Sequence, residues 1–401
     1  MTAFYLQSTG DWEVLAEQVP YLTARLLGSN EDEAYLAPKD SGEQGDLYDH
    51  CCRALDRSLD RMGAHGLPLM GTGDWNDGMN RVGRGGQGES VWLGFFLYTI
   101  LASFVPFCER RDDGERAARY ASQKDRLALA LDETSWDGEW YRRAYYDDGT
   151  PLGSAANQEC RIDCLAQAWA VISKAVPEAR ARKAMQAVEK YLIDEGAGMI
   201  RLLTPAFDVC EHDPGYIKGY IPGVRENGGQ YTHGALWAVK ATAEAGWTDR
   251  AATLLTMLSP ATHARSAEGV ATYQTEPYVV AADVYGVAPL VGRGGWTWYT
   301  GSAGWMYRVA LEDVLGFRLN GGHGICLRPR LPSTWDHATI RYRDPETQSV
   351  YEVRLERDRT RSGGILEVMM DGEALFPGQD EIQVPLLRDG GAHAVKVVIG
   401  A

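Results

Sequence analysis

The side chains best suited to chemistry lie in three glycine-rich segments of the 401-residue chain. The first, residues 67–90, reads LPLMGTGDWNDGMNRVGRGGQGES and carries Asp74, Trp75 and Asp77 at its centre. Loops of this length inside a compact domain are usually functional or disordered. One interpretation is a cluster of Asx turns that starts a helix. The other is an Asp beside an indole, where burial raises the carboxyl pKa so that the group donates a proton as a general acid.

Part of the same segment imitates a phosphate-binding loop. Residues 83–90, GRGGQGES, match the spacing G-x-x-x-x-G-K-S, except that Glu89 stands where the lysine belongs. A carboxylate at that place would repel the phosphates of a nucleotide, and we expect no strand before the loop. We therefore exclude nucleotide binding here.

The second segment, residues 223–237, reads GVRENGGQYTHGALW and places Arg225, Glu226 and His233 before an apolar helix that we expect to begin near Ala235. A histidine near a helix start is often a capping or core residue. Together with the free backbone N–H groups of a helix N-terminus, it is also suited to bind an anion. Both interpretations stay open on sequence alone.

The third segment, residues 292–308, reads GRGGWTWYTGSAGWMYR and repeats this design. Thr300, Gly301 and Ser302 stand directly before a predicted helix, where hydroxyl and amide groups can hold an oxyanion or a phosphate. The simpler interpretation is a Thr or Ser that caps the helix.

Aromatic residues suggest a class of ligand for these segments. The chain has 12 Trp and only 8 Phe. Flat, amphipathic rings suit the faces of sugars better than they suit core filling, so we expect a carbohydrate substrate. The tryptophans in or beside the three segments are Trp75, Trp237, Trp296, Trp298 and Trp305.

The elements that must position these segments are mainly helices up to about residue 320. Apolar residues at spacings of three and four predict ten of them. Their ranges are 12–27, 47–62, 90–105, 116–132, 162–175, 178–194, 230–245, 248–258, 277–286 and 300–314. After residue 321 the apolar period changes to two, which predicts short strands. The expected fold is a helical domain over residues 1–320 and a small antiparallel β-sandwich over residues 321–401.

Residues 91–108, VWLGFFLYTILASFVPFC, form an uncharged run long enough for a membrane span. The run contains polar residues, and its charged flanks show no one-sided basic bias. A helix that is apolar all round also suits the interior of a large helical protein. We interpret this segment as a buried helix.

Charge and cysteine usage limit the partners and the compartment. A net charge of -15 without a basic run argues against DNA or RNA as a partner. Seven cysteines and an N-terminus without the pattern of a signal peptide predict a reducing cytoplasm without structural disulfides. Cys160 and Cys164 have no second pair at ligand spacing, so we expect no metal.

Four motifs together carry a resemblance to a known family. DWNDGMNRVG, ENGGQYTHGALW, TEPYVVAADVYG and WTWYTGSAGWMYR occur in this order and cover most of the chain. They resemble glycoside hydrolase family 94, which contains inverting phosphorylases of β-linked glucosides. The version here is most similar to the phosphorylase-like domain of cyclic β-1,2-glucan synthases and to 1,2-β-oligoglucan phosphorylases.

The resemblance implies a fold, a reaction and roles for individual residues. It implies an (α/α)6 toroid followed by a jelly-roll-like sandwich, with Asp77 as general acid and Trp75 at the donor sugar. Glu226, with Arg225 beside it, would bind sugar hydroxyls, and a second set would hold phosphate: His233, Thr300 and Gly301. The reaction implied is phosphorolysis of a β-glucan by inorganic phosphate to α-glucose 1-phosphate, without a cofactor.

The resemblance also implies that the first helices of the toroid do not precede Met1, so we expect a separate polypeptide, or a membrane glucan synthase, to complete it. Two rival functions stay open. One is a hydrolase on the same toroid, which needs a second carboxylate as base, for which Glu276 is the candidate. The other is a non-catalytic, carbohydrate-binding part of a glucan synthase.

Overall fold

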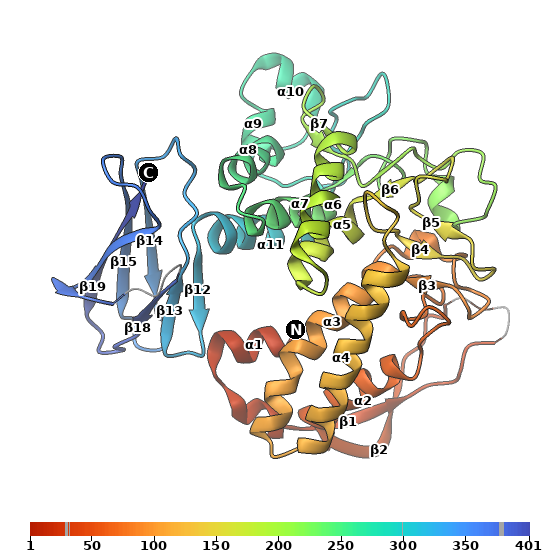
Figure 1. Cartoon of the computed structure of the whole chain (residues 1–401), viewed down its shortest axis with the longest axis horizontal. Coiled ribbons are helices and arrows are strands. Elements are labelled where there is room, and N and C mark those ends of the chain that lie inside the picture. Colours follow the sequence, from red (N-terminus) through yellow and green to blue (C-terminus); the bar gives the residue numbers. More distant parts are fainter. Residues whose placement is uncertain (29–30, 32, 299, 377–380) are drawn as a thin grey trace.

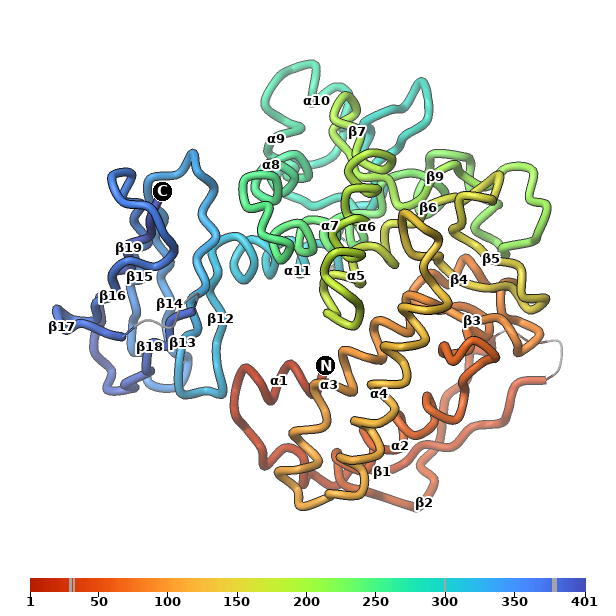
Figure 2. The backbone as a smooth tube through the Cα atoms, viewed as in Figure 1, coloured from red at the N-terminus to blue at the C-terminus, as the bar shows by residue number. Residues whose placement is uncertain are grey.

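The computed structural model describes residues 1–28, 31, 33–298, 300–376 and 381–401, and of Thr300 only the backbone. Helices dominate as far as Val314, and strands follow from Phe317. Figure 1 shows the strands of the C-terminal part on one side of the helical part, and the tube in Figure 2 shows the chain passing between them through a single helical segment. Each part has a large apolar core of its own.

The first sixty residues differ from the expected helix over 12–27. A short helix α1 (Thr2–Thr9) and a 3-10 turn η1 (Trp12–Ala16) lead into a hairpin of β1 (Gln18–Thr23) and β2 (Lys39–Asp46). The prediction fails because Pro20 has no N–H for a helix interior, and its β-branched and aromatic neighbours favour a strand. Helix α2 (Leu47–Leu59) follows, with Asp46 accepting a hydrogen bond from the Asp49 N–H as its N-cap.

The apolar run forms most of helix α3 (Val91–Arg110), which packs along α4 (Gly114–Thr134) as Figure 1 shows. By length and composition α3 could cross a membrane, with a mean hydropathy of 1.9 over its apolar window. Half of that window is buried inside the protein. The interpretation of α3 as an internal helix fits this buried half and stays a prediction for the other half.

Helix α3 packs against α5 (Cys164–Ser173), and α5 packs against α7 (Thr232–Glu244). Nearly every side chain of α5 and α7 is buried, as expected for helices that are apolar all round. Their partners α4, α6 (Glu178–Tyr191) and α8 (Thr248–Leu258) bury one face each. The result is a row of helix hairpins with α3, α5 and α7 inside.

A two-residue strand stands directly before each of these inner helices. β3 (Glu89–Ser90) precedes α3, β6 (Ile162–Asp163) precedes α5, and β10 (Gln230–Tyr231) precedes α7. Each pairs with a strand from another loop, so the loops are fixed where the helices begin. The partners and the remaining short pair are β4 (Ala144–Tyr145), β5 (Pro151–Leu152), β9 (Leu203–Thr204), β11 (Asp283–Val284), β7 (Ile193–Asp194) and β8 (Met199–Ile200).

The helix predicted over 277–286 is wrong. This segment makes a turn and then enters strand β11, which binds back to β10. Its apolar run is short, and such a run does not distinguish a helix from a buried strand. Before it lie the short helices α9 (Pro260–His263) and α10 (Ala267–Tyr273), and after it α11 (Thr300–Arg308) runs into a π-helical turn η4 (Val309–Val314).

The C-terminal part consists of two sheets around one apolar core. One sheet has the order β12-β13-β18 and the other β14-β15-β19-β16-β17. The expectation of a purely antiparallel arrangement is wrong, because β15 and β19 pair in parallel in the middle of the larger sheet. The strands are β12 (Phe317–Asn320), β13 (Gly324–Leu327), β14 (His337–Arg343), β15 (Val350–Asp358), β16 (Ile365–Met370), β17 (Glu373–Ala374), β18 (Ile382–Pro385) and β19 (Ala392–Gly400).

Candidate active site

Asp74 belongs to a fully buried ion pair. Arg143 donates two hydrogen bonds to its carboxylate, with N–O distances of 2.6 and 2.7 Å, and the Ser90 hydroxyl donates a third at 2.6 Å. Burial alone would raise the pKa of Asp74, but the Arg143 guanidinium holds it below its usual value. Asp74 is therefore ionised and fully engaged, which excludes it as an acid with a raised pKa.

Asp74 also starts the chain of turns that carries Asp77. Its Oδ1 accepts a hydrogen bond from the Asn76 N–H at 2.9 Å, and Asn76 Oδ1 in turn accepts one from the Gly78 N–H at 3.1 Å. These are two successive Asx turns, so the first interpretation of this segment is confirmed. They begin the 3-10 helix η2 (Asp77–Met79), whose first side chain is exposed.

Asp163 is the second carboxylate on the same guanidinium. Its Oδ2 lies 3.4 Å from Arg143 Nε, and both side chains are completely buried. Burial raises the pKa of Asp163 to about 6, with Asp74 adding to the rise and Arg143 opposing it. One arginine thus ties the start of α5 to the loop that carries Asp77, because Asp163 caps that helix by accepting a hydrogen bond from the Leu165 N–H.

Asp77 faces groups from two other segments. Tyr216, in the 3-10 helix η3 (Tyr216–Gly219), lies beside it, and burial together with a hydrogen bond to Asp77 raises the pKa of this tyrosine. Glu226 is buried, and its pKa is raised first by burial and further by the charges of Asp77 and Asp283. The exposed carboxylate of Asp77 therefore lies next to partly desolvated polar groups, Tyr216 and Glu226, which form one wall of the candidate site.

Arg225 and Glu226 form a pair within that wall. Arg225 Nε lies 3.4 Å from Glu226 Oε2, and the guanidinium lies over the rings of Tyr220 and Trp296. Glu226 Oε2 is buried without a hydrogen-bond partner among the described residues. An acceptor in this state fits a ligand that brings hydroxyl donors, because a buried acceptor left unpaired costs free energy.

Backbone contacts hold this wall against the start of α7. β10 pairs with β11, the Thr232 N–H donates to the Ala282 carbonyl at 2.8 Å, and the Ala282 N–H donates to the Trp296 carbonyl at 2.6 Å. Asp283, in β11, is 1% exposed and accepts a hydrogen bond from the Trp296 N–H at 3.0 Å. The second and third glycine-rich segments therefore meet across β11.

Trp75 and His233 form a second group of contacting side chains. Trp75 Nε1 donates to His233 Nδ1 at 3.4 Å, and the indole also packs against Tyr231 and Trp237. Burial lowers the pKa of His233 to about 4, so the ring is neutral at pH 7. Its Nε2 is buried without a partner among the described residues.

Gly301 lies next to this histidine. A Cβ at Gly301 would be 3.9 Å from His233 Nδ1, so the start of α11 meets the start of α7 here. Thr300 begins α11, but its side chain lies outside the described part of the chain. The structure thus brings Trp75, His233 and Gly301 together, and it places Asp77 within electrostatic reach of Glu226, which pairs with Arg225.

Two positions behave differently from the rest. Glu89, at the place of a phosphate-loop lysine, is 2% exposed and accepts hydrogen bonds from the His65 and Leu67 N–H groups, so it anchors the loop. For Glu276, no described contact joins its carboxylate to Asp77; its carbonyl accepts from the Val279 N–H in a turn.

Sequence reasoning missed four residues of this site: Arg143, Asp163, Tyr216 and Asp283. Arg143 and Asp163 carried no visible signal, because each stands in an ordinary sequence and acquires its partner only through the fold. Within the described residues, no group of three or more His, Cys, Asp or Glu side chains could hold a metal ion.

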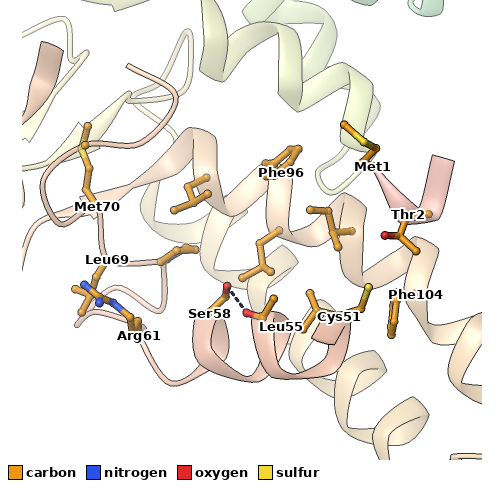
Figure 3. A pocket seen from close by; sticks show the side chains of 17 residues that line it. Met1, Thr2, Cys51, Leu55, Ser58, Arg61, Leu69, Met70, Phe96 and Phe104 are labelled. Atoms are coloured by element: carbon orange, nitrogen blue, oxygen red, sulfur yellow. Dashed lines mark hydrogen bonds between the residues drawn. The ribbon is translucent and has the colours of Figure 1, made fainter. Parts of the chain in front are cut away.

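An apolar cavity of 480 Å³ lies next to this loop. It is lined by one face of α3, by α2 and by the start of α1, and it reaches Gly73, where a Cβ would lie 3.1 Å from the Asp77 Cα. Figure 3 shows Met1 and Phe104 toward one end and Leu69 and Met70 toward the other, with Phe96 between them. Part of α3 that is not buried in the core thus faces an open, apolar hollow.

The glycosyl hydrolase 94 superfamily, catalytic domain, matches residues 1–316. The chain belongs to this family. It is 50% identical over 333 residues to the cyclic beta-(1,2)-glucan synthase NdvB of Rhizobium meliloti (strain 1021), a match that covers 83% of this chain and 12% of that protein.

Two phosphorylases are similar over nearly the whole chain. The solabiose phosphorylase of Paenibacillus borealis is 32% identical over 98% of this chain and 48% of its own length. The N,N'-diacetylchitobiose phosphorylase of Vibrio furnissii is 28% identical over 99% of this chain and 45% of its own length. The chain spans about half the length of these phosphorylases and a smaller part of the synthase.

Proposed function

We propose that this chain carries the catalytic centre of an inverting phosphorylase that cleaves a β-linked glucan with inorganic phosphate and releases α-glucose 1-phosphate. No cofactor takes part, and phosphate is the co-substrate. We further propose that the helix hairpins belong to an (α/α)6 toroid and that the two C-terminal sheets form a jelly-roll-like sandwich. Family membership and the phosphorylases among the relatives support this proposal.

The observation that carries the proposal is the different state of the two aspartates in the first segment. The carboxylate of Asp74 is fully engaged in the ion pair with Arg143. The side chain of Asp77 is exposed, on a turn that Asp74 holds in place. A general acid must reach the leaving oxygen and exchange its proton, which an exposed carboxyl group on a fixed backbone can do. Asp77 is therefore the acid in our proposal.

The reaction needs no general base. An inverting glycosidase uses one carboxylic acid to protonate the leaving oxygen and one carboxylate to activate water on the opposite face of the sugar. Phosphate is already an anion and attacks the anomeric carbon directly. Asp77 gives its proton to the glycosidic oxygen, that bond breaks as the new C–O bond to phosphate forms, and the configuration inverts to α.

Glu226, Arg225 and Trp75 hold the sugar in this proposal. The buried Oε2 of Glu226, which has no hydrogen-bond partner among the described residues, accepts a hydrogen bond from a sugar hydroxyl, and the ion pair with Arg225 keeps that carboxylate in position. Trp75 offers an indole face close to Asp77. Burial of Glu226 strengthens such hydrogen bonds, because they form away from water.

Phosphate binds between the starts of α7 and α11 in this proposal. The Trp75 N–H occupies Nδ1 of His233, so the hydrogen of the neutral ring is on Nε2, which donates to a phosphate oxygen. The backbone at Thr300 and Gly301 adds N–H donors at a helix N-terminus. A neutral imidazole and backbone N–H groups form weaker hydrogen bonds to phosphate than a cation does, so we expect binding in the millimolar range.

We propose a β-1,2-linked glucan as the substrate, because the synthase relative that is 50% identical is named for that linkage. The seven free cysteines support a reducing compartment such as the cytoplasm.

We also propose that a further polypeptide covers the apolar cavity of Figure 3 and is needed for full activity. The relatives extend well beyond the region that this chain matches, and the cavity reaches the backbone of Asp77 through Gly73. Covering it would bury the free face of α3 and exclude water next to the acid. That polypeptide is a separate chain or a part of a membrane glucan synthase.

The test is the release of α-glucose 1-phosphate from β-1,2-gluco-oligosaccharides, with and without phosphate. Activity that requires phosphate and gives the α anomer, read by NMR, supports a phosphorylase. Release of glucose without phosphate would instead support a hydrolase. If the chain alone is inactive, the same assay is repeated with the polypeptide that matches the remaining length of the relatives. Inactivity of that mixture on a β-1,2, a β-1,3 and a β-1,4 glucan would contradict the proposal.

A further inference from the structure

Three basic side chains line two neighbouring cavities at the far end of α7 from His233. Lys174, Arg328 and Arg330 are common to a cavity of 430 Å³ and a smaller one of 70 Å³. Arg328 and Arg330 also line a third cavity of 740 Å³ between the helical part and the C-terminal sheets. From His233 to Glu244, which lines the first two cavities, α7 rises roughly 16 Å.

Of the carboxylates that line the two smaller cavities, all but Glu381 have cationic partners among the described residues. Glu244 pairs with Lys240 at 2.8 Å, and Asp313 pairs with Lys240 at 2.9 Å and with Arg318 at 2.7 Å. Further out, Glu178 pairs with Arg182 and Glu312 with Arg308, and Glu381 lines the smaller cavity.

Lys174, Arg328 and Arg330 take no part in these ion pairs. Lys174 and Arg328 are exposed and Arg330 is half-buried, and among the described residues none of the three makes a side-chain hydrogen bond or an ion pair within 4 Å, although the protein carries a net charge of -15. Burial lowers the pKa of the Arg330 guanidinium and the charge of Arg328 lowers it further, while the charges of Glu244 and Asp313 oppose this shift in part. A half-buried cation that is crowded by a second cation, and that no carboxylate contacts directly, destabilises the fold unless an anion joins it.

We propose that Lys174, Arg328 and Arg330 bind a phosphate group, supplied as inorganic phosphate or as the phosphate monoester of a sugar, at a site separate from the candidate active site. Two guanidinium forks and one ammonium match a tetrahedral dianion, which offers oxygens to all three, whereas a single carboxylate satisfies one fork. The 430 Å³ cavity leaves room for a sugar attached to the phosphate. The proposal does not depend on the reaction proposed for Asp77.

Stability offers a direct test, because an unpaired, desolvated cation should be retained at a cost in stability. Arg330→Met keeps the apolar stem and removes the charge, so without phosphate it should raise the Tm. Arg318→Met is the matched control: it removes a paired arginine from the same network, and we expect it to lower the Tm.

Binding completes the test. Inorganic phosphate, α-glucose 1-phosphate, acetate and glucose are titrated by calorimetry and by thermal shift into the wild type and into Arg330→Met, Arg328→Gln and His233→Ala. We expect phosphate and glucose 1-phosphate to raise the Tm of the wild type and of His233→Ala. Their affinity should fall at least tenfold in Arg330→Met and Arg328→Gln, and acetate and glucose should have little effect. Arg341→Gln, an exposed arginine that lines none of the three cavities, should behave like the wild type.

Three outcomes would overturn the proposal. Phosphate binding that survives Arg330→Met and Arg328→Gln but is lost in His233→Ala would place the anion at the candidate active site only. Acetate binding as tightly as phosphate would mean an unselective basic surface. A lower Tm of Arg330→Met without phosphate would mean that the arginine serves the fold. A stronger response to glucose 1-phosphate than to phosphate would identify the sugar ester as the source of the phosphate group.

Discussion

The indole N–H of Trp75 points at Nδ1 of His233 across 3.4 Å. This contact sets the state of the histidine, because a neutral imidazole that accepts at Nδ1 carries its hydrogen on Nε2. Burial, which lowers the pKa of the ring to about 4, keeps it neutral. A tryptophan expected to touch sugar therefore also orients the donor expected to touch phosphate.

The first prediction concerns this pair. His233→Phe keeps a ring of similar shape but removes the Nε2 donor, so the KM for phosphate should rise about tenfold, the worth of one hydrogen bond. Trp75→Phe should raise it less, since it only frees the histidine to change tautomer. Steady-state kinetics at varied phosphate, or phosphate titration by NMR, measures both. Unchanged KM values in both variants would separate His233 from phosphate.

The second prediction distinguishes the two aspartates. Asp77→Asn should lower the phosphorolysis rate at least about 100-fold, because an amide cannot donate the required proton. Its stability should change by less than about 0.5 kcal/mol, since the side chain is exposed. Asp74→Asn should instead lose about 3 to 5 kcal/mol of stability, because it breaks a buried ion pair with Arg143.

Urea unfolding and initial rates on the same preparations give both numbers. Equal losses of activity in folded samples of the two variants would contradict the assignment of Asp77 as the acid.

The third prediction concerns pH. Asp163 has a pKa of about 6 in the folded protein and about 3.9 in an unfolded chain, so the folded state binds more protons between these values and stability falls as pH rises through them. His233 has a folded pKa of about 4 and an unfolded pKa of about 6.5, so stability rises with pH over a similar range.

Removing each group should therefore change the slope in opposite directions. Between pH 4 and pH 6, Asp163→Asn should make the free energy of unfolding rise more steeply with pH than in the wild type, and His233→Gln should make it rise less steeply. Urea unfolding at several pH values measures these slopes. Parallel curves for all three proteins would mean that neither group is perturbed as described.

The fourth prediction concerns α3. We expect the purified chain to remain in the supernatant without detergent, because half of the apolar window is buried and the charged flanks are balanced. Flotation with phospholipid vesicles measures partition directly. Ile100→Ser, on the face that lines the apolar cavity, is the control: if α3 inserts into bilayers, this change should reduce flotation. Flotation of the wild type that Ile100→Ser abolishes would overturn the interpretation of α3 as an internal helix.

Apolar periodicity predicted most of the helices well. The range predicted over 248–258 coincides with α8, and the ranges for α4, α5 and α6 differ from the structure by a few residues. The predictions failed where a proline interrupts the pattern, as in 12–27, and where a strand competes for a short apolar run, as in 277–286. The hairpin at β1 and the strand β11 replace predicted helices, and the parallel neighbours β15 and β19 are far apart in the sequence, so no local pattern reveals their pairing.

The sequence was sufficient to predict the reactive side chains of the candidate site, but not the side chains that hold them in place. Asp77, Trp75 and His233 stand in glycine-rich segments with unusual composition, and the structure brings the three segments together. The role of Arg143 could not be predicted from the sequence, because it depends on two carboxylates from other segments of the chain. The choice between Asp74 and Asp77 likewise needed the fold, since only burial and partners separate two aspartates three positions apart.

Backbone hydrogen bonds hold helix α1 to the turn that directly follows β12, the first C-terminal strand. The N–H groups of Gly321 and Gly322 donate to the carbonyls of Gln7 and Ser8, at 2.7 and 3.0 Å. This contact closes a loop that contains almost the whole helical part. Closing so long a loop costs much conformational entropy, and this cost arises before the contacts that compensate for it have formed. We therefore expect α1 to dock last during folding, and its amide hydrogens to exchange with solvent earlier than those of α5 and α7.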